Sequence, residues 1–376
     1  PRPIEPAVAE RAAVDAVLGA DDGRRDVAPP RGGHDRATWR SLLLPTLHAV
    51  NDRVGWISPT AIDYVADRIG VSPAEIYGVA TFYGLFATTE RPARQVHVCV
   101  DVACRSHPDR FDPPPGTHPS ACLGLCDRAP AAFLTHAGDP VSRTAVAPID
   151  TGLAGALAGD RRPGDEPDPA AAVPQAGDPS LVLLRRAGRS QPLDLDAYLA
   201  DGGFEAWRIA RELGPDGVIA AVADSGLTGR GGAGFPTARK WAAVRSQDAT
   251  ARYLIANADE SEPGTFKDRT LIENDPYALV ESMLIAALAT SSSTGIVYLR
   301  GEYARAEATL STALVRCRER GLLGTDAGCT IDIVRGAGAY ICGEETAIFN
   351  SVEGYRGEPR NKPPFPHESG LFGLPT

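Results

Sequence analysis

Aromatic side chains are scarce in this sequence, since Phe, Trp and Tyr together make up 6% of its 376 residues. Glycine and proline are abundant instead, with 39 and 32 residues, which favours small-residue packing and many turns over an aromatic-rich core. Net positive charge is also lacking, because the formal net charge is −10. Binding to nucleic acid without sequence preference needs a basic face, so we expect no nucleic-acid partner.

Long apolar runs are missing as well. The longest uncharged stretch covers residues 282–299 and is interrupted by the polar run TSSSTG, so it predicts two elements of a globular fold and no membrane span. The charged, Pro-rich stretch from Glu5 to Arg31 lacks the pattern of a signal peptide. We therefore expect a cytoplasmic protein without direct membrane insertion, which lies at the inner face of a membrane only where partners take it there.

A chain of this length has room for two or three domains. Residues 1–36 mix Pro, Gly, Asp and Arg without an apolar period, which predicts a disordered N-terminal segment. Three short helical patterns follow, two of them with Ser-Pro starts at Ser58 and Ser72, and they predict a helical bundle over residues 37–90. The Pro- and Asp-rich residues 159–179 predict a linker.

Strand patterns lie on both sides of this linker. The Val-rich run QVHVCV at residues 95–100 predicts a strand, and SLVLLRR at residues 180–186 is a second candidate. Residues 253–258 and 295–300 are buried-strand candidates separated by an apolar helix at residues 276–290. This β-α-β alternation predicts an α/β fold with a mainly parallel sheet in the C-terminal part of the chain.

Four of the seven cysteines form two pairs, C-x4-C and C-x3-C: Cys99, Cys104, Cys122 and Cys126. A cytoplasmic chain does not favour a disulfide framework, so metal or redox chemistry is the leading interpretation. A [2Fe–2S] cluster needs four thiolates, which two separate loops can present. Structural zinc sites usually use tighter C-x2-C pairs, so zinc and unligated buried thiols are the weaker alternatives. The other three cysteines are spaced far apart and are expected to be small buried apolar residues: Cys317, Cys329 and Cys342.

A glycine-rich segment, GLTGRGGAGFPTARKW at residues 226–241, contains a G-x-G-x-x-G pattern beginning at Gly229. Glycines let backbone N–H groups approach an anion or a flat ring, and the nearby cations would add to such a site. The pattern follows a helix-like run and not a strand, so it does not match a standard Rossmann fingerprint, and no G-K-[ST] follows it. A flexible surface loop is the alternative.

Two acidic segments accompany this loop. NADESEPGTFKDR, residues 257–269, directly follows a predicted strand, where ligand sites of α/β folds usually lie, although a solvated acidic loop fits equally. Residues 336–366 combine a Gly-rich turn with the pair Glu344 and Glu345 and a Pro-rich stretch. An ordinary turn followed by a surface loop is the alternative for that segment.

Two stretches of the sequence resemble one known family. The run TLHAVNDRVGWISPTAIDYVADRIGVSPAEIYGVATFYGLF, with VHVCVDVAC and ACLGLCDRAPA after it, resembles the thioredoxin-like ferredoxin subunit of the NADH-dehydrogenase module of complex I. The three later segments resemble the flavin subunit of the same module. The resemblance implies a thioredoxin-like [2Fe–2S] domain at residues 91–158 and an FMN/NADH-binding domain at residues 180–376. Both on one chain resemble the diaphorase subunits of NAD-dependent formate dehydrogenases and NAD-reducing hydrogenases.

The resemblance also implies cofactors and their contacts: FMN, NAD(H) and one [2Fe–2S] cluster on the four paired cysteines. The implied FMN contacts are Gly229, Gly231, Lys240, Asn257, Asp259, Glu260, Tyr340, Gly343, Glu344 and Glu345. The implied NAD(H) contacts are Arg230, Gly232, Phe235, Glu262, Lys362 and Phe365. No protein side chain is expected to be catalytic, because the chemistry takes place on FMN.

The sequence departs from the family in two places. The segment between the cysteine pairs, RSHPDRFDPPPGTHPSA, is short and Pro-rich, so we expect a trimmed thioredoxin-like domain. The sequence stops at GLFGLPT without the C-x-x-C-x-x-C motif that holds a [4Fe–4S] cluster in the family, so we expect this chain to lack that cluster and to be C-terminally truncated.

The implied function is an NADH:acceptor oxidoreductase, or diaphorase, in which hydride transfer between NAD(H) and FMN is followed by single-electron transfer to iron–sulfur clusters. The implied partners are other subunits of a redox complex: an iron–sulfur subunit, a formate dehydrogenase, a hydrogenase or a quinone module. A non-catalytic electron-transfer or assembly module with a degenerate flavin site is the alternative.

Overall fold

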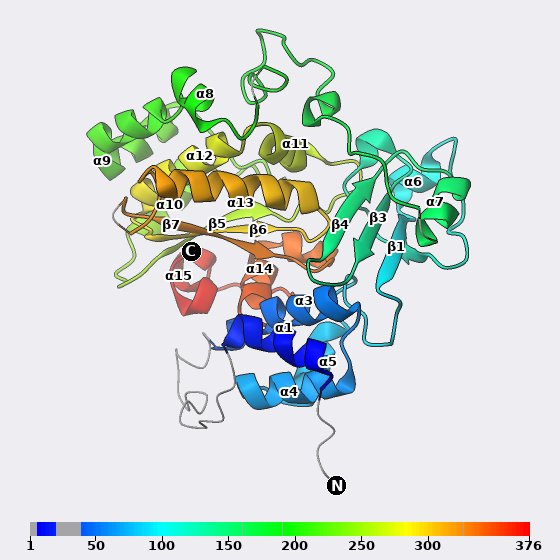
Figure 1. Cartoon of the computed structure of the whole chain (residues 1–376). Helices are drawn as coiled ribbons and strands as arrows, with labels where there is room; N and C mark the ends of the chain where they lie inside the picture. The colour runs from blue at the N-terminus through cyan, green and yellow to red at the C-terminus, as the bar shows by residue number, and fades with distance from the viewer. Residues whose placement is uncertain (1–5, 20–38, 160, 190, 326) are drawn as a thin grey trace.

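The computed structural model describes residues 6–19, 39–159, 161–189, 191–325 and 327–376 (Figure 1). Most of the segment predicted to be disordered lies outside these residues. The prediction is wrong for Val8–Leu18, which form helix α1. Ala13 and Val14 are buried where this helix packs on α3, and Glu10 accepts a hydrogen bond from the Ala7 N–H at 2.9 Å. The helix is stabilised by a tertiary contact that the composition of the segment does not indicate.

With α1, three helices form the predicted helical bundle: α3 (Leu43–Val54), α4 (Pro59–Ile69) and α5 (Pro73–Ala80). Ser58 caps α4 by accepting the Ala61 N–H at 3.0 Å, and Ser72 caps α5 in the same way. Gly55 and Gly70 end α3 and α4 in left-handed conformations, with φ of 96° and 75°. The Ser-Pro starts and glycine ends therefore act as the sequence indicates.

A four-stranded sheet follows, with strand order β2-β1-β3-β4. Its strands are β1 (Arg94–Cys99), β2 (His118–Ser120), β3 (Ala132–His136) and β4 (Ser142–Val146). β1 pairs in parallel with β2, whereas the β1–β3 and β3–β4 pairs are antiparallel. The short segment between the cysteine pairs thus keeps one strand, β2, although it is mostly irregular. Two helices belong to this part: α6 (Val102–Ser106) and α7 (Thr151–Ala158).

A three-stranded sheet of order β5-β6-β7 makes up the centre of the C-terminal part, and both of its strand pairs are parallel. Its strands are β5 (Tyr253–Ala258), β6 (Thr294–Leu299) and β7 (Thr330–Arg335). The crossover helices are α12 (Pro276–Thr290) and α13 (Ala304–Glu319), which share an apolar core with the sheet (Figure 1). The predicted α/β class, the parallel sheet and the apolar crossover helix are confirmed.

The predicted strand at residues 180–186 is wrong, because this segment forms turns. Val182 and Leu183 are 80% and 72% exposed, so the apolar run has no neighbouring strand to pair with and no face to bury. The remaining helices surround the three-stranded sheet: α8 (Leu195–Ala200), α9 (Glu205–Asp224), α10 (Thr237–Arg245), α11 (Lys267–Asn274), α14 (Glu345–Val352) and α15 (Pro366–Ser369).

The helical bundle and the three-stranded sheet share one continuous core. Apolar side chains of the bundle pack with Ile296 and Tyr298 of β6 and with Phe349 of α14. At the centre of this contact, the buried Tyr83 hydroxyl lies 2.8 Å from Ser351 Oγ and 3.1 Å from the Tyr355 carbonyl oxygen. The predicted domain boundaries stay predictions, but the bundle does not have a core separate from the sheet.

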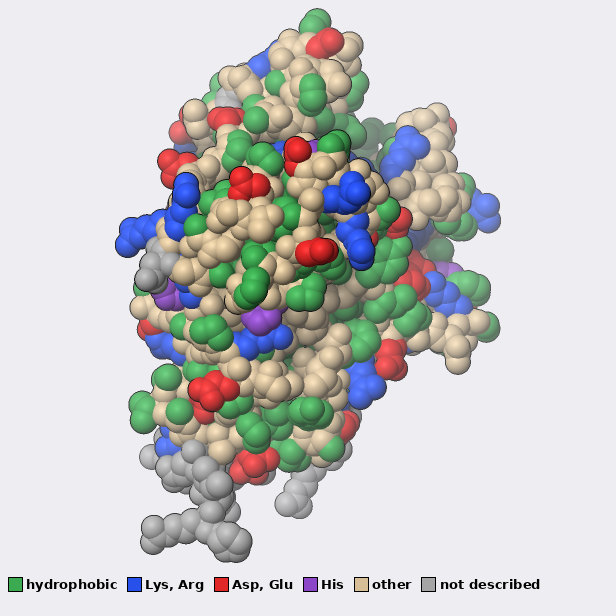
Figure 2. Space-filling model, turned by 90° about the vertical axis from the view of Figure 1, so that its right-hand side faces the viewer, with side chains coloured by type: hydrophobic (Ala, Val, Ile, Leu, Met, Phe, Trp, Pro, Cys, Tyr) green, Lys and Arg blue, Asp and Glu red, His purple; other side chains and the backbone are tan. Residues whose placement is uncertain are grey.

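Among the residues that the structure describes, no helix has the length and apolar character needed to cross a membrane. On the face shown in Figure 2, acidic and basic side chains are interspersed and do not gather by sign.

We expect Tyr83→Phe to lower the free energy of unfolding by about 1–2 kcal/mol, because it removes a buried hydroxyl whose partners then lose a hydrogen bond. Denaturant unfolding followed by circular dichroism measures this change. Tyr77→Phe is the matched control, since Tyr77 is 53% exposed and the change should stay within about 0.5 kcal/mol. Equal effects of the two substitutions would contradict the role given to Tyr83.

Candidate functional site

The two cysteine pairs meet at one end of the four-stranded sheet. Cys99 is the last residue of β1 and Cys104 lies in α6, while Cys122 and Cys126 lie on the loop after β2. The Asp101 side chain joins the two pairs, because one carboxylate oxygen caps α6 at 2.7 Å from the Val102 N–H and the other accepts the Cys122 N–H at 3.1 Å. The sequence analysis missed Asp101, although its place inside VCVDVAC is typical of a helix cap.

The four thiols are packed together and shielded. Cys99, Cys104 and Cys122 are at most 5% exposed, and the Sγ atoms of Cys122 and Cys126 lie 3.4 Å apart. Cys99 in turn contacts Cys104 and Cys122. Hydrogen bonds from the Cys126 and Cys99 thiols, and then the Gly124 N–H at 3.4 Å, lower the pKa of the Cys122 thiol to about 2.

This donor set fits the predicted cluster. Within the described ranges, no group of three or more Cys, His, Asp or Glu side chains is arranged for a single metal ion. The thiols stand instead as contacting pairs on two separate loops, which is the ligand arrangement of a [2Fe–2S] cluster. Backbone N–H groups of Gly124 and Gly264 point at the sulfurs of Cys122 and Cys126, at 3.4 and 3.2 Å.

The glycine-rich loop leads into α10 and has an open backbone. Its base is closed by the Gly229 N–H, which donates to the Phe235 carbonyl at 2.8 Å. At Gly231, Gly232 and Gly234 an added Cβ would meet no atom within 4 Å, so a ligand has free access to the backbone there. Phe235 is 50% exposed, with the Arg239 guanidinium 5.5 Å from the centre of its ring. Among the described residues, Arg230 forms no hydrogen bond or ion pair with the other predicted contacts.

Two lysines and two glutamates connect α10, α14 and the Pro-rich segment. Lys240 Nζ lies 3.1 Å from Glu345 Oε2, and Lys362 Nζ bridges Glu345 at 2.7 Å and Glu344 at 3.1 Å. Burial acts against it, but hydrogen bonding from Lys362 and the charge of Lys240 hold the pKa of Glu345 below its usual range. Four predicted site residues from three segments therefore form one network.

The carboxyl end of β5 brings in further predicted residues. Asn257 donates to the Gly343 carbonyl at 2.8 Å, which fastens the strand end to the turn before α14. Asp259 is 7% exposed, and burial, followed by the charge of Glu302, raises the pKa of its carboxyl to about 7. Tyr340, which is 61% exposed, donates its hydroxyl proton to Glu262.

Glu260 and Phe365 stand apart from this group. The Glu260 carboxylate caps α11 by accepting the N–H groups of Asp268 and Arg269 at 2.9 and 3.1 Å, and it also accepts the Tyr303 hydroxyl at 3.0 Å. Its side chain is therefore used inside the fold. Phe365 is 49% exposed and stacks on His367 with ring centroids 6.0 Å apart.

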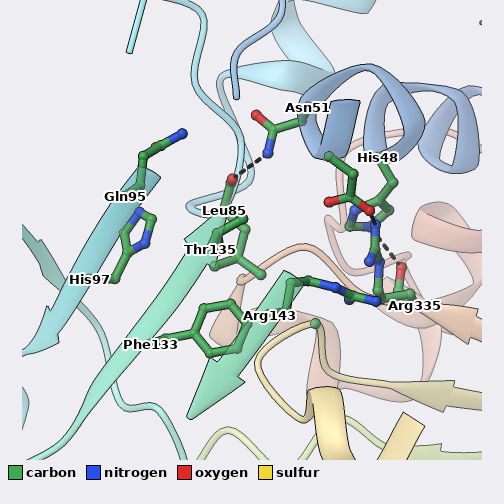
Figure 3. Close-up of a pocket in the computed structure, with 11 residues that line it drawn as sticks. His48, Asn51, Leu85, Gln95, His97, Phe133, Thr135, Arg143 and Arg335 are labelled. Carbon is green, nitrogen blue, oxygen red and sulfur yellow. Dashed lines mark hydrogen bonds and ion pairs between the residues drawn. The ribbon is translucent and has the colours of Figure 1, made fainter. Parts of the chain in front are cut away.

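A small cavity lies away from these residues, between α3, the four-stranded sheet and β7 (Figure 3). Its volume of about 20 Å³ has room for one water molecule, far less than a flavin or a nicotinamide needs. His97 lies on β1 beside this cavity, 6% exposed, and neither of its ring nitrogens has a partner among the described residues. Burial, followed by the charge of His118, lowers the pKa of this imidazole to about 4.

Asp259 predicts a pH effect on stability. Its folded pKa of about 7 lies above the unfolded value of about 4, so its contribution is complete below pH 4 and is lost as the pH rises through 7. Wild type should therefore lose stability relative to Asp259→Asn between pH 5 and pH 8. Thermal unfolding of both proteins across that range measures the difference. The exposed Asp216, changed to Asn, is the control, and a pH-independent difference for Asp259→Asn would contradict the shift.

Two family models match separate parts of the chain. Residues 222–373 match the Nuo51 FMN-binding domain, and residues 33–109 match the thioredoxin-like [2Fe–2S] ferredoxin. The predicted resemblance to both families is thus confirmed. The second match includes Cys99 and Cys104 and ends before Cys122.

The curated relatives resemble the C-terminal part, and each is the subunit designated F of an NADH-quinone oxidoreductase. The chain is 47% identical over 200 residues to the relative from Aquifex aeolicus (strain VF5), covering 52% of this chain and 47% of the relative. It is 49% identical over 193 residues to the relative from Escherichia coli (strain K12), covering 50% of this chain and 43% of the relative. The chain thus spans about half the length of the curated relatives it matches.

One solved structure matches both parts together. A chain of an NAD⁺-reducing [NiFe]-hydrogenase in its air-oxidised state superimposes with a TM-score of 0.67 and 32% identity, over 89% of this chain and 58% of that chain. The arrangement of the two parts on one chain is therefore shared with a solved redox protein.

Proposed function

We propose that this chain is the diaphorase module of a larger redox complex. It carries out hydride transfer between NAD(H) and FMN, followed by single-electron transfer to its [2Fe–2S] cluster. The observation that carries the proposal is the Gly264 N–H on the Cys126 sulfur at 3.2 Å. Gly264 lies on residues 257–269, the same segment that holds Asn257, Asp259 and Glu262. One loop thereby borders both the predicted flavin contacts and the predicted cluster ligands.

FMN, when bound, supplies hydride exchange with NAD(H) and one-electron exchange with an iron–sulfur cluster. The chain's own part is binding, orientation and charge. The open N–H groups around Gly231 and Gly232 suit a phosphate, and Lys240 supplies positive charge at the start of α10. Phe235 is free to stack on a flat ring. A carboxyl with a pKa of about 7, that of Asp259, can hold or release a proton at neutral pH at the end of β5.

The lysine–glutamate network gives this site a defined resting state. Lys240 and Lys362 are both paired with Glu344 and Glu345, so an incoming anion competes with carboxylates that are already in place. Charge pairs in which the lysine or the carboxylate is 30–53% exposed are weak, and such competition costs little free energy. We infer that the FMN and NAD(H) contacts are the residues predicted for them, with Glu260 contributing through its backbone because its carboxylate is committed to α11.

The similarity to a flavin-domain subunit of NADH-quinone oxidoreductases and to an NAD⁺-reducing hydrogenase supports partners of that kind, an iron–sulfur subunit together with a hydrogenase, formate dehydrogenase or quinone module. The decisive assay is NADH–ferricyanide reductase activity of the full chain with added FMN. Activity together with flavin uptake supports the enzyme. Protein that shows a [2Fe–2S] signal but neither takes up FMN nor oxidises NADH would be the non-catalytic electron-transfer module instead.

Phe235→Ala should raise KM for NADH by about 3- to 10-fold with little change in kcat, because one aromatic stacking contact is worth about 0.5–1.5 kcal/mol. Steady-state kinetics at saturating FMN measure this. Arg208→Gln is the control, since Arg208 is an exposed residue of α9 that pairs only with its helix neighbours Glu205 and Glu212. An unchanged KM for Phe235→Ala would remove Phe235 from the NADH site.

Cys104→Ser should abolish or strongly alter the EPR signal of the dithionite-reduced, anaerobically prepared protein, because one of four thiolate ligands is lost. FMN binding should persist, since Cys104 belongs to the four-stranded part. Cys329→Ala is the control, a buried cysteine outside the paired set. A wild-type signal from Cys104→Ser would exclude Cys104 as a ligand.

A further inference from the structure

The loop that carries Cys122 and Cys126 is held from outside its own sheet. Arg300 follows β6 directly, and its guanidinium donates to the Cys122 carbonyl and to the Glu260 carbonyl. It also pairs with Glu302 at 3.0 Å. The Arg300 side chain is 3% exposed, so these bonds form where water cannot replace them.

A second buried arginine grips the same loop one turn further along. Arg269 of α11 donates from Nε to the Gly124 carbonyl at 3.1 Å and from Nη2 to Asp127 Oδ1 at 2.6 Å. Its side chain is also 3% exposed, and it pairs with Glu273 at 3.5 Å. Two guanidinium groups from the three-stranded part therefore hold two successive carbonyl sites of the cysteine loop.

Shape reinforces these bonds. Gly124 adopts φ of 68°, and a Cβ added to it would lie 2.3 Å from Cε1 of the buried Tyr303. Only glycine fits between the two cysteines at this point. On the other side of the loop, the Gly264 N–H donates to Cys126 Sγ. The C-x3-C loop is thus pressed against the three-stranded part over its whole length.

The direction of the bonds matters for the sulfurs. Because the arginines hold the Cys122 and Gly124 carbonyl oxygens, these oxygens are directed to the guanidinium groups, and the Gly124 N–H remains directed at Cys122 Sγ. N–H groups directed at cluster sulfurs stabilise the more negative, reduced cluster and raise its potential. Each guanidinium is also paired with a carboxylate, so the effect comes from the orientation of the loop more than from net charge.

We propose that Arg269 and Arg300 are positioning residues for the iron–sulfur cluster. They fix the Cys122–Cys126 loop in its ligating conformation and make the cluster easier to reduce from the flavin side. This inference rests on the proposed function, because it requires the four cysteines to hold the cluster. It assigns control of the cluster to residues outside the domain that supplies its ligands.

The test is an EPR-monitored redox titration of the full chain, with FMN content and circular dichroism measured on each sample. Arg269→Gln should lower the reduced-to-oxidised ratio of the cluster about tenfold at a fixed potential, equivalent to about 59 mV more negative, and should broaden the signal. Arg300→Gln should act in the same direction. Loss of the cluster with FMN binding retained also supports the proposal.

Arg143→Gln is the matched control. Arg143 of β4 pairs with Glu307 of α13 at 2.9 Å and also joins the two parts, but it does not contact the cysteine loop. Its change should leave the potential and line shape as in wild type.

Should Arg269→Gln and Arg300→Gln fail to fold, Arg269→Lys decides, because it keeps the charge but cannot bond Gly124 and Asp127 together. A wild-type potential and line shape in Arg269→Lys, or in a folded Arg269→Gln, overturns this inference alone. Wild-type protein without any [2Fe–2S] signal overturns the proposed function instead.

Discussion

Arg300 is a buried cation at the carboxyl end of β6, and both parts of the molecule bond to it. It reaches the Cys122 carbonyl in one direction and the Glu260 carbonyl in the other, with Glu302 balancing its charge. A buried guanidinium needs nearly all of its donors paired, so neither contact can be lost cheaply. The relative position of the cysteine loop and the loop after β5 follows from this requirement.

The same edge of the three-stranded sheet organises the rest of the site. β5 ends in Asn257, whose side chain fastens the turn at Gly343, and that turn leads directly into the Glu344 cap of α14. Glu345 then meets Lys240 from α10. Parallel strands place their carboxyl ends together, so segments nearly 90 residues apart in sequence come into contact at one place.

The helical bundle supports this edge from the other face of the sheet. Tyr83 reaches Ser351 in α14, and Ser351 also lies 2.8 Å from the Tyr298 hydroxyl of β6. These hydroxyl groups are buried, so their mutual hydrogen bonds specify how the bundle seats on the sheet. The bundle is thereby part of the base on which the predicted flavin contacts stand, although it contributes none of them.

The sequence by itself determined the local features: the Ser-Pro helix starts, the strand that ends at Cys99, the apolar crossover helix and the identity of both cysteine pairs. Each depends on residues near one another in the chain, where periodicity, capping and spacing act directly. Tertiary structure alone decided the rest. It folded Val8–Leu18 against α3, left residues 180–186 without a strand partner, turned the Glu260 carboxylate into the fold, and placed Arg269 and Arg300 on the cysteine loop. Those outcomes depend on contacts between distant segments, and no local pattern encodes which distant partner a side chain will meet.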